Sequence, residues 1–87
     1  MIKITTTTIE EILGWKNKEL FPGSSHLQVQ YGYGNFVLSY TDYVNLSDES
    51  GFGWNLRVDN SKFEVLANCS VEYIEQVVAI MEIYKDY

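Results

Sequence analysis

The chain has few side chains that could carry out catalysis, with one histidine, His26, and one cysteine, Cys69. His26 follows the turn-forming residues 22–25 and could act as a general base, but it has no Cys, Ser or Asp partner in a recognised catalytic spacing. Cys69 precedes an expected helix, where the helix-terminal amides could make the thiol nucleophilic. We favour the alternative that Cys69 has a structural role, as a small buried residue where the sheet joins the helix. We therefore predict that the protein is not an enzyme.

Carboxylates are the most abundant functional groups, with 12 Asp and Glu residues against 6 Lys and Arg and a formal net charge of -6. Asp42, Asp48 and Glu49 are close in sequence and could gather around a hard cation such as calcium. Their spacing does not match an EF-hand loop, which needs oxygen ligands at alternate positions and a closing glutamate. Solvated loop carboxylates are the simpler interpretation, so we predict no metal and no cofactor.

The acidic excess lies in two places, the segment from Asp42 to Glu49 and the last residues of the chain. In a C-terminal helix, positions 72, 75, 79, 82 and 86 would form one stripe opposite the apolar face. Such a stripe is either a solvated surface or a strip that docks on a basic cleft of a partner. The predicted partner-binding residues are Asp42, Asp48, Glu49, Glu72, Glu75, Glu82 and Asp86.

Two other features suggest nucleotide or nucleic-acid binding, and both have a simpler explanation. The seven tyrosines could stack on bases, but binding sites of that kind also need a basic groove, and the net charge of -6 would repel a polyanion. Gly32 with Gly34 and Gly51 with Gly53 lie within hairpin patterns, whereas a phosphate-binding glycine loop lies between a strand and a helix. We predict no direct contact with nucleic acid.

The clearest structural pattern is a hairpin within residues 27–43. Apolar residues alternate with polar or small ones on both sides of Gly34 and Asn35, which can adopt the positive φ values of a two-residue turn. This turn places all the large apolar side chains on one face, because opposed residues of a hairpin share a face. It predicts three opposed pairs, which are Tyr33 with Phe36, Tyr31 with Leu38, and Val29 with Tyr40.

A second hairpin is expected after the acidic loop. Its first strand alternates Phe52, Trp54, Leu56 and Val58, residues 59–61 turn the chain, and its second strand continues with Phe63, Val65 and Ala67. The sheet would then contain four antiparallel strands. Residues 2–7 favour a short extended segment that could add another strand.

Two helices are expected at the ends of the chain. Thr8 and Glu11 have the spacing of a capping box and predict a helix over residues 9–19, which ends before Pro22. Ser70 can cap a second helix that runs to about residue 85. Its apolar residues recur at spacings of three and four, and they are Val71, Ile74, Val77, Val78, Met81 and Tyr84.

These elements predict a single α+β domain over residues 1–87, with a four-stranded antiparallel sheet and both helices packed on its apolar face. No apolar run is long enough for a signal peptide or for the roughly 20 residues that span a bilayer. A lone cysteine fits a reducing compartment. We therefore expect a cytoplasmic protein that is not inserted in a membrane.

In size, acidity and mixed α+β layout, the whole chain resembles the small acidic inhibitors that phages and mobile elements encode against host defences, of the anti-CRISPR type. This resemblance implies stoichiometric inhibition of a CRISPR effector or nuclease, in which carboxylates compete with guide RNA or DNA for lysines and arginines of the partner. Two alternatives stay open. The chain could be a toxin-immunity protein, or a general interaction or assembly module, acting as a monomer or a homodimer.

Overall fold

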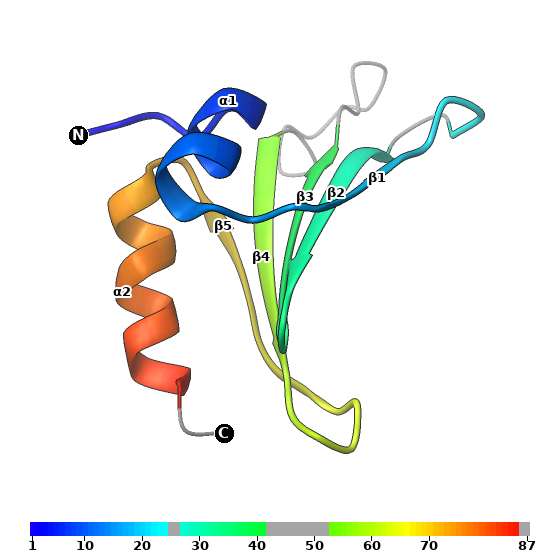
Figure 1. Ribbon diagram of the computed structural model, residues 1–87. Helices are drawn as coiled ribbons and strands as arrows, with labels where there is room; N and C mark the ends of the chain where they lie inside the picture. The colour runs from blue at the N-terminus through cyan, green and yellow to red at the C-terminus, as the bar shows by residue number, and fades with distance from the viewer. Residues whose placement is uncertain (25–26, 42–52, 86–87) are drawn as a thin grey trace, which may run out of the picture.

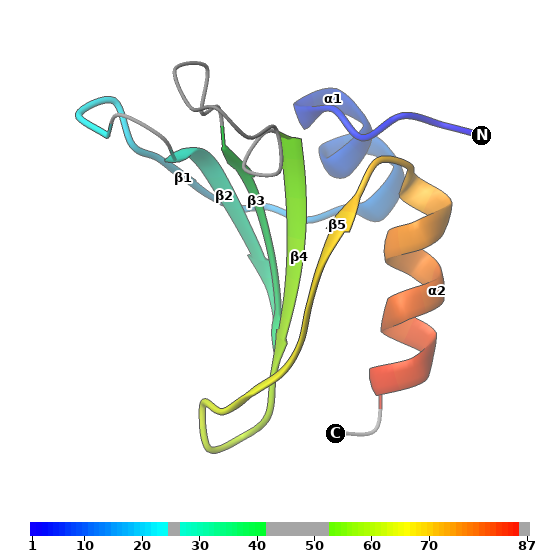
Figure 2. The same ribbon diagram turned by 180° about the vertical axis from the view of Figure 1, so that it is seen from behind.

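The computed structural model describes residues 1–24, 27–41 and 53–85, and its centre is a curved antiparallel sheet with the helices on one side (Figures 1 and 2). The α+β class is confirmed. The sheet contains five strands in sequence order, one more than predicted. They are β1 (Asn17–Leu20), β2 (Leu27–Tyr33), β3 (Phe36–Thr41), β4 (Gly53–Asp59) and β5 (Val65–Val71).

The β2–β3 hairpin forms in the predicted register. Tyr33 lies opposite Phe36, Tyr31 opposite Leu38, and Val29 opposite Tyr40. Gly34 in the turn has a φ of 58°, which a side chain would make unfavourable. The predicted apolar face is the buried one, since Val29, Tyr31, Phe36 and Leu38 all belong to the core.

The β4–β5 hairpin differs from the prediction in its second strand. Phe63 is not a strand residue with a buried side chain. It has a φ of 63° in the turn, and its side chain is 88% exposed. The turn is longer than predicted because the side-chain oxygen of Asn60 accepts hydrogen bonds from the amides of Lys62 (2.8 Å) and Glu64 (3.0 Å). Val65 begins β5 and is also exposed. Phe52 lies outside the described residues.

The N-terminal helical segment is shorter than predicted and begins earlier. It consists of α1 (Thr6–Thr8) followed by the π-helical turn η1 (Ile9–Leu13). The capping box joins Thr5 and Thr8, whose side chains accept each other's amides at 3.1 and 2.8 Å, and not Thr8 and Glu11. Gly14, with a φ of 73°, ends the helix.

Residues 14–19, predicted as helix, form instead the crossing from η1 to the edge of the sheet and most of β1. Trp15 lies on this crossing and is 1% exposed. β1 then pairs antiparallel with β2. The physical reason is that burial of a large aromatic side chain and a strand ladder outweigh a helical propensity that amounts to tenths of a kcal/mol per residue.

The C-terminal helix α2 (Ile74–Tyr84) begins later than predicted, because Ser70 belongs to β5 and does not cap it. The side-chain oxygen of Gln76 accepts the amides of Glu72 (2.7 Å) and Tyr73 (2.9 Å) in front of the helix. The N-terminal segment also pairs with this joint through a bridge between Lys3 and Tyr73. The extended segment predicted over residues 2–7 is thus present only as a single bridge, and Thr6 and Thr7 belong to α1.

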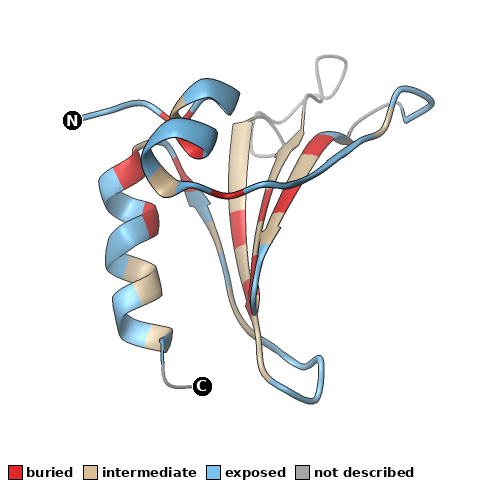
Figure 3. Cartoon of the chain, in the orientation of Figure 1, coloured by how far each residue is buried: buried red, intermediate tan, exposed pale blue. Residues whose placement is uncertain are grey.

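The core lies between one face of the sheet and the helices (Figure 3). Its members come from the N-terminal segment, η1, the crossing segment, β2 to β5 and α2, whereas α1 and β1 contribute none. The core residues are Ile4, Ile9, Trp15, Val29, Tyr31, Phe36, Leu38, Leu56, Val58, Val71, Ile74 and Val77. The opposite face of the sheet carries polar side chains such as Gln30, Ser39 and Asn55, which lie opposite one another on β2, β3 and β4.

Candidate functional site

The predicted acidic strip is partly formed on the outer face of α2. Glu75 and Glu82 are exposed, and they are seven residues apart, which places them on one side of a helix whose Ile74 and Val77 are buried. Figure 3 shows the outer side of α2 as largely exposed. Glu72 is also exposed, but it precedes the helix and does not belong to its stripe.

Each described member of the strip has a partner within the chain. Glu72 pairs with Lys3 (3.6 Å between Oε2 and Nζ), and Glu82 pairs with Lys85 (3.1 Å). The Glu75 carboxylate accepts the Ile2 amide at 3.1 and 3.3 Å, and this hydrogen bond is the main reason that the pKa of Glu75 is lowered. A partner protein would have to exchange these contacts, which are weak because water and salt screen them.

The remaining predicted partner-binding residues, Asp42, Asp48, Glu49 and Asp86, lie outside the described residues, as does His26. The geometry of the acidic loop and of the calcium alternative is therefore not described. Cys69 does not lie before the helix cap. It is a half-buried residue of β5 opposite Leu56, with its Sγ 3.9 Å from the Leu56 carbonyl oxygen.

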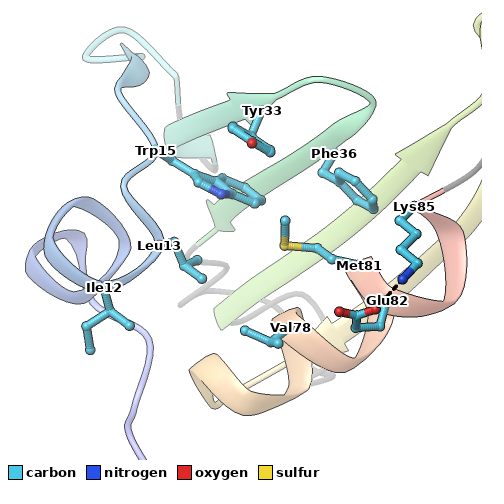
Figure 4. A pocket seen from close by; sticks show the side chains of 9 residues that line it. All are labelled: Ile12, Leu13, Trp15, Tyr33, Phe36, Val78, Met81, Glu82 and Lys85. Carbon is cyan, nitrogen blue, oxygen red and sulfur yellow. Dashed lines mark ion pairs between the residues drawn. The ribbon is translucent and has the colours of Figure 1, made fainter.

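The sequence did not predict a groove that opens beside α2 (Figure 4). The groove has a volume of about 440 Å³, and the N-terminal helix, the crossing segment, the β2–β3 turn and α2 contribute to its walls. We call it the apolar groove. It is lined by Ile12, Leu13, Trp15, Tyr33, Phe36, Val78, Met81, Glu82 and Lys85.

Aromatic residues form the floor and one end of the apolar groove. The rings of Trp15 and Tyr33 stack at 5.6 Å between centroids with 11° between their planes. Trp15 is fully buried, whereas Tyr33 is 52% exposed at the end of β2. Because Trp15 is anchored in the core, its ring helps to hold the Tyr33 ring in place. Figure 4 shows Met81 projecting from α2 toward these rings.

The walls of the groove expose apolar side chains that nothing in the described chain covers. Ile12 on η1 is 51% exposed and Val78 on α2 is 44% exposed. Glu82 and Lys85 form the polar rim, where their ion pair is drawn in Figure 4. The groove and the acidic strip therefore meet at Glu82. Such a surface can bind an apolar group beside a positive charge.

A group of three polar side chains, Glu10, Lys18 and Tyr31, joins the N-terminal helix to the sheet. The Tyr31 hydroxyl donates to the Glu10 carboxylate at 2.6 Å, and the Lys18 ammonium lies 3.4 Å from the same oxygen. These contacts, the tyrosine first, lower the pKa of Glu10. Burial, with a contribution from Glu10, raises the pKa of Tyr31 above its usual value. The arrangement is well suited to fixing the helix on the sheet.

One sequence signal could have indicated the groove. In α2 only Glu75, Gln76 and Glu82 are polar. The helix therefore has more apolar residues than fit on the one face that packs against the core. The excess includes Val78 and Ile83, which are both exposed. Sequence periodicity assigned Val78 to the core because it could not tell a packed apolar residue from one on an open wall.

Comparisons with known proteins identify no relative, since no family model, no curated protein and no solved structure matches the chain. Within residues 1–24, 27–41 and 53–85, no three His, Cys, Asp or Glu side chains group together in a way that could hold a metal ion. The helices of the described chain are all too short or too polar to cross a membrane. The acidic face of α2 and the apolar groove remain as the candidate sites.

Proposed function

We propose that this protein is a non-enzymatic inhibitor that binds a basic, nucleic-acid-binding surface of a partner protein, such as a CRISPR effector or a nuclease. By occupying that surface in the cytoplasm of the host cell, it blocks engagement of guide RNA or DNA. Its carboxylates replace phosphates as partners of the lysines and arginines, so the inhibitor and the nucleic acid compete directly.

The observation that supports this proposal is the exposed acidic face of α2. Glu75 and Glu82 lie on one rigid helix in a protein with a net charge of -6. A helix holds carboxylates at fixed spacing, which lowers the entropy cost of docking. The summed negative potential would also speed association with a basic partner.

The apolar groove favours a second candidate function, a general protein-interaction module. Half-exposed Ile12, Tyr33 and Val78 lie together beside buried aromatic residues, and clusters of this kind are typical of binding surfaces. In this function the acidic residues tune the association rate while the groove supplies the affinity. A toxin-immunity protein would be one instance of such a module.

The test begins with affinity capture from cells of the natural host, identification of the bound protein, and titration of that purified partner at rising KCl concentration. The double variant Glu75→Gln, Glu82→Gln should bind about tenfold more weakly than wild type at low salt. The matched control Glu19→Gln, Glu64→Gln removes the same charge from exposed positions elsewhere and should bind within about twofold of wild type.

Nucleic acid supplies the second half of this test. The inhibitor proposal requires that guide RNA or target DNA displaces the protein from its partner, because both compete for the same basic residues. If both double variants bind like wild type at every salt concentration, the acidic face only solubilises the protein. If binding is tight but unaffected by nucleic acid, the interaction-module alternative is the better description.

A further inference from the structure

The outer edge of β5 carries backbone groups that have no partner in the described part of the chain. The carbonyl of Glu72, just past the strand, points away from the sheet and accepts the Ile4 amide at 3.0 Å. Along an antiparallel strand, the backbone groups of alternate residues point to the same side. The amides and carbonyls of Asn68 and Ser70 therefore also point outward, where β5 has no neighbouring strand. Both residues are exposed, so another chain can reach them.

The two edges of the sheet differ in their protection against such pairing. β1 is only four residues long and carries Lys18 and Glu19, and the Lys18 ammonium is held by Glu10 of the N-terminal helix. β5 has seven residues, and none of them is charged or a proline. Short length and charged side chains are the usual means by which proteins prevent pairing at an edge strand. The edge of β5 is therefore the one that is open to another strand.

The free part of this edge has a definite length. Ile4 occupies the edge at Glu72, so an added strand must end before that point. β5 itself fits the free part over its full length when it is paired antiparallel, with Val65 of one copy opposite Val71 of the other. This register places Asn68 opposite itself, so that two outward-pointing amides and carbonyls exchange hydrogen bonds.

We propose that β5 pairs antiparallel with β5 of a second copy of this chain, about a two-fold axis at Asn68, and joins the two sheets into one. Each copy uses the same surface, as in other two-fold interfaces. Because the pairing consumes the unprotected edge of both copies and leaves only the protected β1 edges, assembly ends at the dimer. The inference goes beyond the proposed function and does not depend on it, since the acidic face of α2 takes no part.

Exposed apolar side chains at both ends of β5 favour a second copy over an unrelated strand. At the start of the strand, Phe63 is 88% exposed and Val65 is 56% exposed. Beyond its other end lies Ile2, which is 43% exposed and whose carbonyl accepts the Ile74 amide at 2.8 Å. Antiparallel pairing brings the start of one β5 to the end of the other, so these apolar groups meet twice in the dimer. Burial of apolar surface then adds to the backbone hydrogen bonds.

Charge separates this contact from binding of a basic partner. Each copy carries a net charge of -6, whereas β5 contributes no charge to the contact. Repulsion between the two copies is strongest at low salt and is screened as the salt concentration rises. Dimerisation should therefore strengthen with KCl, whereas docking of the acidic face on a basic partner weakens with KCl. Failure of one inference can thus be told from failure of the other.

The first test is sedimentation of the full-length protein over a range of protein and KCl concentrations, with amide hydrogen exchange followed by NMR. Exchange of the Asn68 and Ser70 amides should slow as the dimer forms. The amides of Lys18 and Leu20 are the control. They point outward from β1, because the neighbouring Phe21 directs its amide to the Gln28 carbonyl at 3.2 Å. Their exchange should not depend on protein concentration.

A charge at the two-fold axis provides the second test. Asn68→Asp retains the acceptor for the side-chain hydrogen bond from Asn55, but it sets two carboxylates opposite each other in the dimer. It should weaken dimerisation by about tenfold or more. Asn17→Asp is the matched control, because it makes the same change at an exposed position of β1 and should dimerise within about twofold of wild type. Circular dichroism confirms that each variant is folded.

A cross-link checks the register. In a Cys69→Ser background, Asn68→Cys places two thiols on residues whose Cα atoms are about 5.5 Å apart in the dimer, within the range of a disulfide. Oxidation with copper phenanthroline should link this variant and not Asn17→Cys in the same background. A protein that stays monomeric at every concentration, with rapid exchange at Asn68 and Ser70, would overturn the inference. A dimer that Asn68→Asp leaves unchanged and Asn68→Cys does not link would also overturn it, since another surface would form the contact.

Discussion

At the scale of single residues, Tyr31 performs two tasks that are normally divided between side chains. Its ring is fully buried in the core, while its hydroxyl reaches the Glu10 carboxylate at the surface. Tyrosine can do this because a large apolar ring ends in a polar group. The sequence pattern identified Tyr31 as a core residue, but it could not identify Glu10 as its partner, since the two are brought together only by the fold.

Replacing Tyr31 with Phe is expected to raise the pKa of Glu10 toward its usual value, because the hydroxyl is the largest cause of the lowered pKa. A group whose pKa is lowered by folding stabilises the protein above its unfolded pKa, and that contribution is lost as pH falls through the folded pKa. Stability should therefore depend less steeply on pH in the acid range for Tyr31→Phe than for wild type.

The measurement is a carboxylate titration by NMR together with urea unfolding at several acidic pH values. The carboxylate of Glu75 serves as an internal control. Its pKa is lowered mainly by a hydrogen bond from the Ile2 amide, which the substitution at Tyr31 does not touch, so it should not change. An unchanged pKa of Glu10 in the Phe variant would show that Lys18 alone determines it.

At the scale of elements, the β2–β3 hairpin was predictable residue by residue and the N-terminal helix was not. The hairpin register depends on local information, the turn residues Gly34 and Asn35 and strict alternation around them. The end of the helix depends on Trp15, which is buried in the core and stacks on Tyr33 of β2. Its environment cannot be known from residues 9–19 alone, so both helical and extended continuations were compatible with the sequence.

Gly14 is the local sequence signal for the end of the helix. Its φ of 73° ends the helix and lets the amide of Trp15 reach the Ile9 carbonyl oxygen at 3.3 Å. Gly14→Ala should lower the free energy of unfolding by about 1–2 kcal/mol, the cost of a left-handed conformation for a residue with a Cβ. Urea denaturation measures the effect.

Gly23→Ala is the matched control for that prediction. Gly23 has no positive φ, and an added Cβ would meet no atom within 4 Å. Its replacement should leave stability within about 0.5 kcal/mol of wild type, as for other exposed substitutions. Equal losses in both variants would mean that the left-handed conformation of Gly14 is not the cause of the effect, since the lower flexibility of the unfolded chain by itself stabilises a Gly→Ala variant.

At the scale of the whole molecule, composition predicted that the surface is acidic. It did not predict which groups of the chain lie around the acidic side chains. Each described carboxylate of the predicted strip is engaged by the N-terminal segment or by Lys85. The apolar groove lies directly beside it. Contacts such as Glu75 with Ile2 join the two ends of the chain, and such long-range contacts leave no trace in local sequence patterns. A binding surface that combines charge with apolar walls became visible only when the elements were assembled.

The net charge of -6 also makes a prediction about stability. At 0.01 M salt the screening length is about 30 Å, comparable with the molecular dimensions of 38 × 29 × 22 Å, so every carboxylate repels every other. At 1 M KCl the length is about 3 Å, and the repulsion vanishes. Salt also weakens the ion pairs, but these contribute singly, whereas repulsion grows with the square of the net charge.

We therefore expect the melting temperature to rise by about 2–5 °C between 0.01 M and 1 M KCl, as measured by calorimetry. The variant Glu19→Gln, Glu64→Gln removes two negative charges and should show a smaller rise, which separates screening from other effects of salt on proteins. A melting temperature that falls with salt would mean that attraction within pairs such as Glu72 with Lys3 outweighs the repulsion. The acidic side chains would then be engaged by ion pairs within the chain, and they would be less available to a basic partner protein.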